Sequence, residues 1–363
     1  MIDEAAQLKV LRDTLDNIDN QILDLLNTRM ETVDKVGHVK AKSGGAIYRP
    51  EREQAIIERL TNISKKKNGK LNKQAIEAIF LEIFAVSRNL ELPEKVAFLG
   101  PLGTYTHQMA ESRFGGTSEY VAMNSINGVF KEVSSKRAKF GVIPIENSSS
   151  GIVNDTLMAL NRYDLKIVSN TKMAIHNTFS TNCKNISDVK KIYSKDVVFG
   201  QCREFLSEHN LDNVELVPVE STAKAVQIAL KEENSAAISS HIAATMYGLP
   251  IVFDNIEDDN SNNTEFIIIS DFENQSSGND STAILAKLSK QSGSLVKFLE
   301  DFYKADINLT KIESHTIKQE LVFYIEFDGH KDDNNVKPIL TKHKDQIKVL
   351  GSYTRNNNDT ISA

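Results

Sequence analysis

A long run of helical periodicity at the start of the chain constrains the fold more than any other feature. Apolar residues recur at steps of mostly three and four, at Leu8, Leu11, Leu15, Ile18, Ile22, Leu25, Val33, Val36 and Val39. A helix over about 35 residues would be roughly 50 Å long. It could not bury its apolar face within a region of about 90 residues, so we expect a partner, most simply a second copy of the same helix.

Positively charged residues interrupt this apolar stripe. Arg29 follows Leu25 by four residues, where the spacing predicts an apolar side chain, and Lys40 lies on nearly the same face. Arg12 lies at the edge of that face. The stripe therefore carries cations at positions that a simple helical core would fill with apolar residues.

Two further predicted helices also place polar groups on their apolar faces. The second begins at Arg49-Pro50-Glu51, because proline favours the first helical position and acids favour the first turn. Glu53 on this helix shares a face with apolar residues. The third helix continues an apolar series, Ile76, Phe80 and Ile83, with Ser87 and then Glu91.

A single inward Arg or Glu most often extends its charge to solvent or forms a buried ion pair. Several such positions across three helices are harder to explain in this way, because each unpartnered buried charge is costly. The cations also outnumber the acids. The pattern favours a pocket that holds an anion with more than one carboxylate.

These residues resemble the all-helical chorismate mutase family, in which three helices per chain intertwine as a dimer. The match rests on Leu11-Arg12, Asn27-Thr28-Arg29, Gly37-His38-Val39-Lys40, Arg49-Pro50-Glu51-Arg52-Glu53, Ser87 and Glu91. The resemblance implies a site that rearranges chorismate, a dicarboxylate, to prephenate. Such a reaction needs a compressed substrate and stabilised negative charge rather than a nucleophile.

The resemblance also implies roles for the matching residues. Arg29 and Arg12 would bind the two carboxylates, with Arg12 supplied by the partner chain. Lys40 would contact the ether oxygen, and Arg52 would add positive charge. Glu53 would take the substrate hydroxyl, and Ser87 and Glu91 would close the far side. Arg49 stands where some relatives have an acid, so it either contacts substrate or caps the helix.

The central region alternates short apolar runs with polar loops, which predicts an α/β fold. Residues 96–99 and 140–145 are predicted strands, and a polar loop and a predicted helix follow each of them. Ser221 opens another predicted helix, and residues 259–266 lead into a strand at 267–269. Hydroxyls and amides at several helix starts suit a small polyanion held between two lobes.

These segments resemble prephenate dehydratase, in the same order across the whole central region. The resemblance implies two α/β lobes arranged as in a periplasmic binding protein, with substrate in the cleft. The essential threonine of that family corresponds to Thr264, which would donate to the leaving hydroxyl. The matching substrate contacts are Thr104, Glu146, Asn147, Ser148, Ser194, Gln201, Ser221 and Phe266.

Glu265 departs from the family, which usually has arginine between the threonine and the phenylalanine. An anion beside a dianionic substrate could abolish binding. In an extended segment, however, Thr264 and Glu265 point to opposite faces, so Glu265 would face a neighbouring element. The leading interpretation is an active dehydratase, and the alternative is an impaired, ligand-sensing version.

The last part of the chain predicts a βαββαβ order, typical of a ferredoxin-like fold. It resembles an ACT regulatory domain, which implies feedback by phenylalanine. The residues implied in effector binding are Gly293, Ser294, Leu295, Val296, Glu313 and Ser314. His315-Thr316 replaces a common Arg-Pro pair, and a purely structural dimerisation module is the alternative.

Composition excludes several other classes. The 363 residues carry 43 Lys and Arg against 49 Asp and Glu, a net charge of −6 that argues against nucleic-acid binding. Two cysteines exclude a disulfide framework and a cysteine-rich zinc site. With an acidic start and no long apolar run, we expect a cytoplasmic protein. The reactions that the two resemblances imply need no metal or cofactor.

Polar linkers at residues 92–95 and 273–280, the second of which is predicted to be flexible, divide the chain into three predicted domains. These are a mutase at 1–92, a dehydratase at 95–272 and a regulatory domain at 281–355, acting as a homodimer or a dimer of dimers. The order matches bifunctional enzymes of phenylalanine biosynthesis. A mutase fused to a non-catalytic ligand sensor is the runner-up, and a helical interaction module fused to a binding protein is a third reading.

Overall fold

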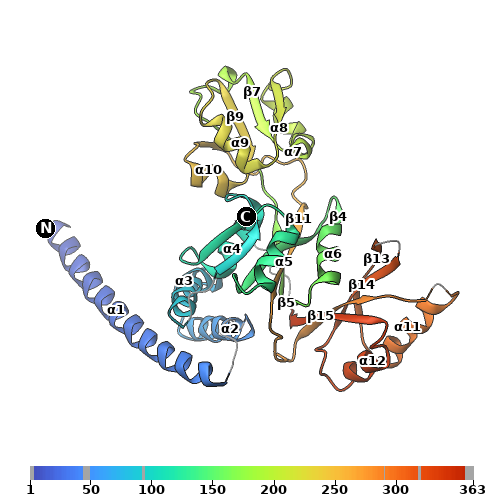
Figure 1. Ribbon diagram of the computed structural model, residues 1–363. Helices are drawn as coiled ribbons and strands as arrows, with labels where there is room; N and C mark the ends of the chain where they lie inside the picture. Colours follow the sequence, from blue (N-terminus) through green and yellow to red (C-terminus); the bar gives the residue numbers. More distant parts are fainter. Residues whose placement is uncertain (1–3, 44–49, 92–94, 290, 318–319, 356–363) are drawn as a thin grey trace. The chain divides into compact units, whose positions relative to one another are not determined.

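The structure is a computed structural model that describes residues 4–43, 50–91, 95–289, 291–317 and 320–355 (Figure 1). The chain forms two compact units. The first contains the chain up to Glu94 together with Phe114–Ser118, and the second contains the remainder.

The first unit is helical, as predicted. Its helices are α1 (Glu4–Ser43), α2 (Pro50–Lys66) and α3 (Lys73–Glu91). Pro50 opens α2, and the side chain of Asn72 accepts a hydrogen bond from the Ala75 amide at 2.8 Å at the start of α3. Helices α1 and α2 both contact α3, and a small core of Ile57, Ile76 and Phe84 forms within the unit.

The apolar face of α1 remains uncovered in the single chain. Leu11 is 60% exposed and Leu25 is 70% exposed, although both belong to the apolar stripe. The helix is 40 residues long, longer than the sequence pattern predicted. An apolar face of this extent is typical of a surface that another chain covers.

The second unit begins with a lobe built on a mixed sheet. Its strands are β1 (Lys95–Leu99), β2 (Glu119–Met123), β3 (Phe140–Asn147), β4 (Gly151–Ile152), β5 (Lys166–Ala174) and β11 (Asn263–Ser270). The order is β2-β1-β3-β11-β5, with β4 paired to β3. Strands β1, β2 and β3 are parallel, whereas β11 runs antiparallel between β3 and β5. The helices of this lobe are α4 (Tyr105–Phe114), α5 (Ile126–Ser134) and α6 (Asn154–Arg162).

A second lobe contains β6 (Thr178–Thr181), β7 (Lys191–Ser194), β8 (Glu215–Pro218), β9 (Ser235–Ser239) and β10 (Ile251–Phe253). The sheet order is β10-β6-β9-β7-β8. Its helical segments are η1 (Ile186–Asp188), α7 (Asp196–Gln201), α8 (Arg203–Glu208), α9 (Thr222–Ala229) and α10 (His241–Tyr247). The chain leaves the first lobe after β5 and returns to it in β11. The expectation of two α/β lobes is therefore confirmed.

The C-terminal part has the predicted βαββαβ order. Its elements are β12 (Asp280–Ala286), α11 (Ser294–Lys304), β13 (Leu309–Ile317), β14 (Glu320–Asp328), α12 (Val336–Lys342) and β15 (Ile347–Thr354). The antiparallel order β13-β14-β12-β15 is that of a ferredoxin-like fold. Phe298, Phe302 and Phe327 fill the core between its sheet and helices.

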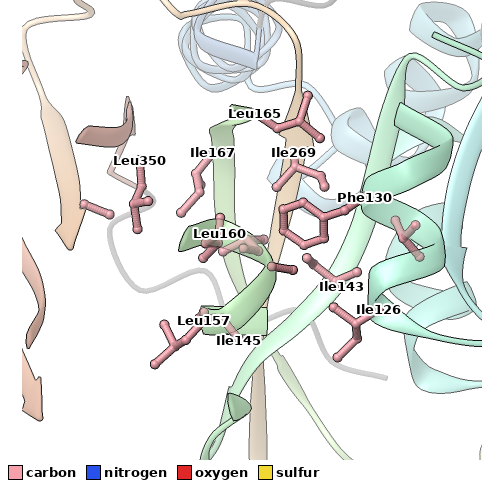
Figure 2. Close-up of a cluster of buried hydrophobic side chains, with 14 of the residues drawn as sticks. Ile126, Phe130, Ile143, Ile145, Leu157, Leu160, Leu165, Ile167, Ile269 and Leu350 are labelled. Carbon is pink, nitrogen blue, oxygen red and sulfur yellow. The ribbon is translucent and has the colours of Figure 1, made fainter. Parts of the chain in front are cut away.

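The C-terminal part shares a hydrophobic core with the first lobe. Figure 2 shows Leu350 near Ile167 of β5, in the cluster that also holds Leu160 and Ile269. Gly351 allows this approach, because its φ is +153° and an added Cβ would lie 2.2 Å from the carbonyl oxygen of Ile167. The C-terminal part and the first lobe are therefore packed against each other instead of being joined only by a linker.

The polar segment at 273–280 is not the loose linker that its composition predicted. The Asn274 side chain donates to the carbonyl oxygens of Val168 at 2.8 Å and Ser352 at 3.1 Å. Asp280 accepts hydrogen bonds from the backbone and side chain of Ser277 at 2.8 and 2.7 Å. Polar composition gave the wrong prediction here because these side chains bond to neighbouring strands and to one another.

The shared core predicts that Leu350→Ala destabilises the second unit. Removing this buried side chain leaves a cavity and should lower the free energy of unfolding by about 2–5 kcal/mol, measured by urea denaturation. Leu321→Ala is the control, because Leu321 is 46% exposed, and should change it by no more than about 0.5 kcal/mol. Equal effects of the two variants would contradict the shared core.

Candidate functional site

In the first unit, the structure brings together two of the predicted mutase residues. The Arg29 guanidinium on α1 donates a hydrogen bond to the Ser87 hydroxyl on α3, 58 residues away in sequence. The same guanidinium lies 5.7 Å from the ring centroid of Phe84, within the range of a cation–π contact. Ser87 itself donates to the Ile83 carbonyl oxygen at 2.6 Å. These contacts fix a cation on the inner face of the helices.

Glu53 forms an ion pair with a residue that the sequence analysis missed. Arg88 donates to Glu53 and, at 3.1 Å, to the carbonyl oxygen of Phe114, and it is only 6% exposed. Arg88 follows the buried Phe84 by four residues, so helical spacing could have placed it near the inner face. A buried cation of this kind needs such a partner to offset its desolvation.

The other predicted mutase residues are either separated from the Arg29–Ser87 contact or lie outside the described residues. Arg12 and Arg52 are exposed. Arg12 lies seventeen residues before Arg29 on the same helix, a separation of about 25 Å, so one chain cannot bring both to one substrate. Arg49 lies outside the described residues, as do the side chains of Lys40 and Glu91.

In the second unit, Thr264 and Asn147 face each other on adjacent strands. They are register partners in the β11–β3 pair, and the Asn147 amide donates to the Thr264 hydroxyl oxygen at 3.0 Å. The Asn147 side-chain oxygen accepts from the Ser149 amide at 3.0 Å, which fixes how the side chain is turned. Because the Thr264 oxygen accepts, its own hydrogen can still be donated to another group.

Ser148 extends this contact between the two predicted loops. Its hydroxyl oxygen accepts from the Asn263 amide at 3.0 Å, and its own amide donates to the Asn263 carbonyl oxygen at 2.9 Å. Phe266, two residues after Thr264, is buried in the protein interior. Segments 146–148 and 262–264 are thus held together by a dense set of hydrogen bonds.

Four further predicted residues serve local structure. The Thr104 hydroxyl accepts a hydrogen bond from the backbone amide of His107 at 3.3 Å, at the start of α4. The Ser221 hydroxyl accepts one from the backbone amide of Lys224 at 3.1 Å, at the start of α9. Ser194 is fully buried and donates to the Ile238 carbonyl oxygen at 2.7 Å. Gln201 ends α7, and its carbonyl oxygen accepts from the Asp258 amide at 2.7 Å.

The two lobes also touch through residues that the sequence analysis did not assign. The Ser240 hydroxyl donates to the Gly103 carbonyl oxygen at 2.8 Å. The Tyr105 hydroxyl lies 2.8 Å from the side-chain oxygen of Asn177, and burial raises its pKa, so it remains a donor. These bonds connect the start of α4 and the loop before it to Ser240 and Asn177.

Glu265 points away from Thr264 toward a neighbouring element, as predicted. One carboxylate oxygen lies 2.7 Å from the Lys311 ammonium on β13, and the other accepts from the Asn170 amide at 2.6 Å. Lys311 also forms an ion pair with Glu146 and is the register partner of Glu326 on β14. Lys311 therefore lies among three carboxyl groups.

Burial and charge set the protonation of this cluster. Burial opposes ionisation of Glu265, but Lys311 and Asn170 hold its pKa below the ordinary value. Burial and the Glu265 charge raise the pKa of Glu326. Burial alone would lower the pKa of Lys311, yet the surrounding carboxyl groups raise it. The cluster thus holds a charged Lys311–Glu265 pair beside a carboxyl group that resists ionisation.

The predicted effector residues lie at the start of α11 and along β13. Gly293 precedes α11 with a φ of +79°, and the Ser294 hydroxyl donates to the Ser289 carbonyl oxygen at 2.7 Å. Val296, Glu313 and Ser314 are exposed, and Leu295 packs against the core. Among the described residues, no group of three or more His, Cys, Asp or Glu could hold a metal ion, and no helix is long and apolar enough to cross a membrane.

The fold and these contacts define a multidomain protein with a helical unit, a two-lobed α/β region and a ferredoxin-like part. Two family models match it: chorismate mutase type II over residues 11–92 and prephenate dehydratase over residues 96–274. The chain belongs to the bifunctional chorismate mutase/prephenate dehydratase family, which confirms the two enzyme resemblances.

Similar proteins cover nearly the whole chain. The bifunctional enzyme of Aquifex aeolicus is 40% identical over 96% of this chain and 98% of its own length. That of Pseudomonas aeruginosa is 36% identical over the same shares. The solved prephenate dehydratase of Arthrobacter aurescens in complex with L-Phe is 28% identical, covers 73% of this chain and 92% of its own, and has a TM-score of 0.67.

The raised pKa of Glu326 gives a pH-dependent prediction. A carboxyl group with a folded pKa above the ordinary 4.5 stabilises the fold fully below that pH, and this contribution is lost as pH rises through the folded pKa. Glu326→Gln does not titrate. Its free energy of unfolding, relative to the unsubstituted chain, should therefore rise as the pH increases above 4.5.

Urea unfolding at several pH values measures this difference. Leu321→Ala, an exposed substitution on the same strand that adds and removes no titrating group, is the control and should give a difference that does not vary with pH. A pH-independent difference for Glu326→Gln would show that Glu326 titrates normally.

Proposed function

We propose that this chain catalyses two consecutive reactions, chorismate to prephenate and prephenate to phenylpyruvate, in phenylalanine biosynthesis. The observation that carries this proposal is the full-length 40% identity to a bifunctional relative, with both family matches in order along one chain. The mutase occupies residues 1–92, the dehydratase 95–272 and a regulatory domain 281–355. Neither reaction requires a metal or a redox cofactor.

In the proposed mutase, Arg29 binds a carboxylate of chorismate. Its contacts with Ser87 and Phe84 support this role, because they hold the guanidinium in one orientation before substrate arrives. Lys40 stabilises the negative charge that develops on the ether oxygen as the carbon–oxygen bond breaks and the new carbon–carbon bond forms. Glu53, Arg52, Ser87 and Glu91 complete the site, and Arg49 either contacts substrate or caps α2.

The proposed mutase is a homodimer. The uncovered apolar face of α1 supports this, because a long helix with exposed leucines is stabilised when a second copy covers it. Arg12 then comes from the partner chain, as the separation from Arg29 along α1 requires. Further association into a dimer of dimers stays a prediction, as does cytoplasmic location.

In the proposed dehydratase, Thr264 donates a hydrogen bond to the ring hydroxyl, which departs as hydroxide while Thr264 keeps its proton. The carboxylate leaves as carbon dioxide, its bonding electrons enter the ring, and the hydroxyl leaves as the ring becomes aromatic. The hydrogen bond from Asn147 supports this role, because it leaves the Thr264 hydrogen to be donated. Thr104, Ser148, Ser194, Gln201, Ser221 and Phe266 are proposed to shape the surrounding site. Glu146, which is paired with Lys311, is proposed to belong to it as well.

The environment of Glu265 favours an active dehydratase over an impaired ligand sensor. A negative charge on Glu265 would repel a dianionic substrate if the carboxylate were unpaired and close to it. In this chain the carboxylate is paired with Lys311 and Asn170 on the side away from Thr264. Its charge is therefore largely offset before substrate binds.

The C-terminal domain is proposed to be an ACT domain that senses phenylalanine. The ferredoxin-like order supports this, as does the solved dehydratase that was crystallised with L-Phe. The exposed positions of Val296, Glu313 and Ser314 suit a ligand held between two copies. His315-Thr316 departs from the common pattern, so affinity for phenylalanine is expected to differ from that of relatives.

The two activities should separate by substitution. With chorismate as substrate, the unsubstituted chain should release phenylpyruvate. Arg29→Ala should lower mutase kcat/KM by about 10²-fold or more and leave dehydratase turnover of added prephenate unchanged. Thr264→Val should leave the mutase activity unchanged and lower the dehydratase kcat by about 10²-fold. Prephenate should therefore accumulate when chorismate is the substrate.

Each variant is the control for the other, since the two residues lie in separate units. Absorbance of phenylpyruvate and disappearance of chorismate report the two steps. Prephenate accumulation by the unsubstituted chain would support the impaired-sensor alternative, and persistence of chorismate would refute the mutase.

Phenylalanine should inhibit the dehydratase reaction. Glu313→Ala should weaken this inhibition, shifting the half-inhibitory concentration by about tenfold, because a hydrogen-bonded charged group near the effector contributes about that much binding. Glu300→Ala, an exposed substitution on α11, is the matched control and should keep the response. Insensitivity of the unsubstituted chain would support the structural-module alternative.

A further inference from the structure

Two carboxylates face each other in the dehydratase lobe. Glu146 on β3 and Glu265 on β11 are register partners, and they follow directly on the Asn147–Thr264 pair. Like charges placed directly opposite on neighbouring strands destabilise a sheet. The Glu265 side chain is 9% exposed and that of Glu146 is 26% exposed, so water screens this repulsion only in part.

Lys311 bridges both carboxylates. Its ammonium group bonds to Glu146 and lies 2.7 Å from Glu265, and its side chain is 19% exposed. Lys311 lies on β13 of the C-terminal ferredoxin-like part, 46 residues beyond Glu265 in the sequence. The pair that would repel is thus held by a cation from another part of the same unit.

The bridge lies next to the proposed reacting hydroxyl. Thr264 and Asn147 are the immediate chain neighbours of Glu265 and Glu146, and the register shifts between Glu265 and Phe266. A bulge bends its strand and increases the local twist. The bond of 3.0 Å from Asn147 to Thr264 lies directly beside this irregularity and the two carboxylates.

We propose that Lys311 is a positioning residue for the dehydratase reaction. By pairing with Glu146 and Glu265 together, it holds β3 and β11 in the register that presents the Thr264 hydroxyl to substrate. Lys311 acts through these carboxylates and does not touch substrate. The inference rests on the proposed dehydratase activity and makes that activity dependent on the C-terminal part of the chain.

The pairing also explains how this chain tolerates glutamate at a position where the family it resembles usually has arginine. The cation is supplied by β13 instead of β11. Because β13 also carries Glu313 and Ser314, a ligand bound there would act on the same strand that holds the two dehydratase carboxylates.

Steady-state kinetics of the full chain test the proposal. Lys311→Met keeps the length of the side chain and removes its charge. It should lower dehydratase kcat about tenfold or more with KM changed less than about twofold, because Thr264 is misplaced while the substrate contacts remain. Lys311→Arg should keep most of the activity.

Lys331→Met is the matched control. Lys331 also lies in the C-terminal part and pairs with Glu273, and its side chain is similarly covered, at 25% exposed. The ion pair that Lys331 forms with Glu273 involves neither β3 nor β11. Lys331→Met should therefore leave dehydratase kcat unchanged. A loss equal to that of Lys311→Met would mean that any weakening of the C-terminal part lowers activity, which would overturn the proposal.

A double variant separates positioning from direct substrate binding. Lys311→Met with Glu265→Gln removes the repulsion as well as the cation, so kcat should recover at least about threefold relative to Lys311→Met alone. A raised KM without recovery would show that Lys311 binds substrate itself and would overturn the proposal.

Amide hydrogen exchange of segments 144–148 and 263–266 gives a readout that does not need turnover. Exchange should rise in Lys311→Met and fall again in the double variant, and unchanged exchange would overturn the proposal. If the unsubstituted chain fails to convert prephenate, the proposed function fails, yet the exchange data still decide whether Lys311 holds these strands.

Discussion

The ammonium group of Lys311 lies among three carboxyl groups, and much of the second unit depends on that arrangement. Partly buried charges are stable only when they are paired and hydrogen-bonded. The pairing of Lys311 with Glu265 and Glu146 therefore fixes β13 against β3 and β11. Together with the hydrophobic core around Leu350, it makes the ferredoxin-like part and the first lobe one packed body.

The helical unit uses the same physical rule on a smaller scale. Its core is small, and charged side chains lie beside it on all three helices. Arg88 is stabilised by Glu53 and a backbone carbonyl group, while Arg29 is oriented by Ser87 and an aromatic ring. Both cations are held in place by neighbouring groups. For Arg29, which is proposed to bind a carboxylate of the substrate, the orientation is thus set before substrate arrives.

Local patterns in the sequence predicted much of the fold. The 3-4 apolar spacing predicted α1, proline marked the start of α2, and alternation placed Thr264 and Glu265 on opposite faces of one strand. Strand and helix order also predicted the ferredoxin-like part. These features depend on neighbours a few residues away, which a single sequence records directly.

Long-range contacts were the part that the sequence did not predict. Lys311 lies 165 residues from Glu146 in the chain, and Arg88 lies 35 from Glu53, so no local spacing reveals either pair. The segment at 273–280 was misread for the same reason, because its polar side chains bond to distant strands. Composition identifies polar residues but not the partners that satisfy them.

A crystal structure of the full chain with phenylpyruvate, the proposed product, would show directly whether Lys311 positions Thr264. The Lys311 ammonium group should lie within hydrogen-bond distance of both Glu146 and Glu265, while the Thr264 hydroxyl faces the bound ligand. Lys311 bound to the ligand carboxylate, with Glu146 and Glu265 separated from it, would rule out the positioning role.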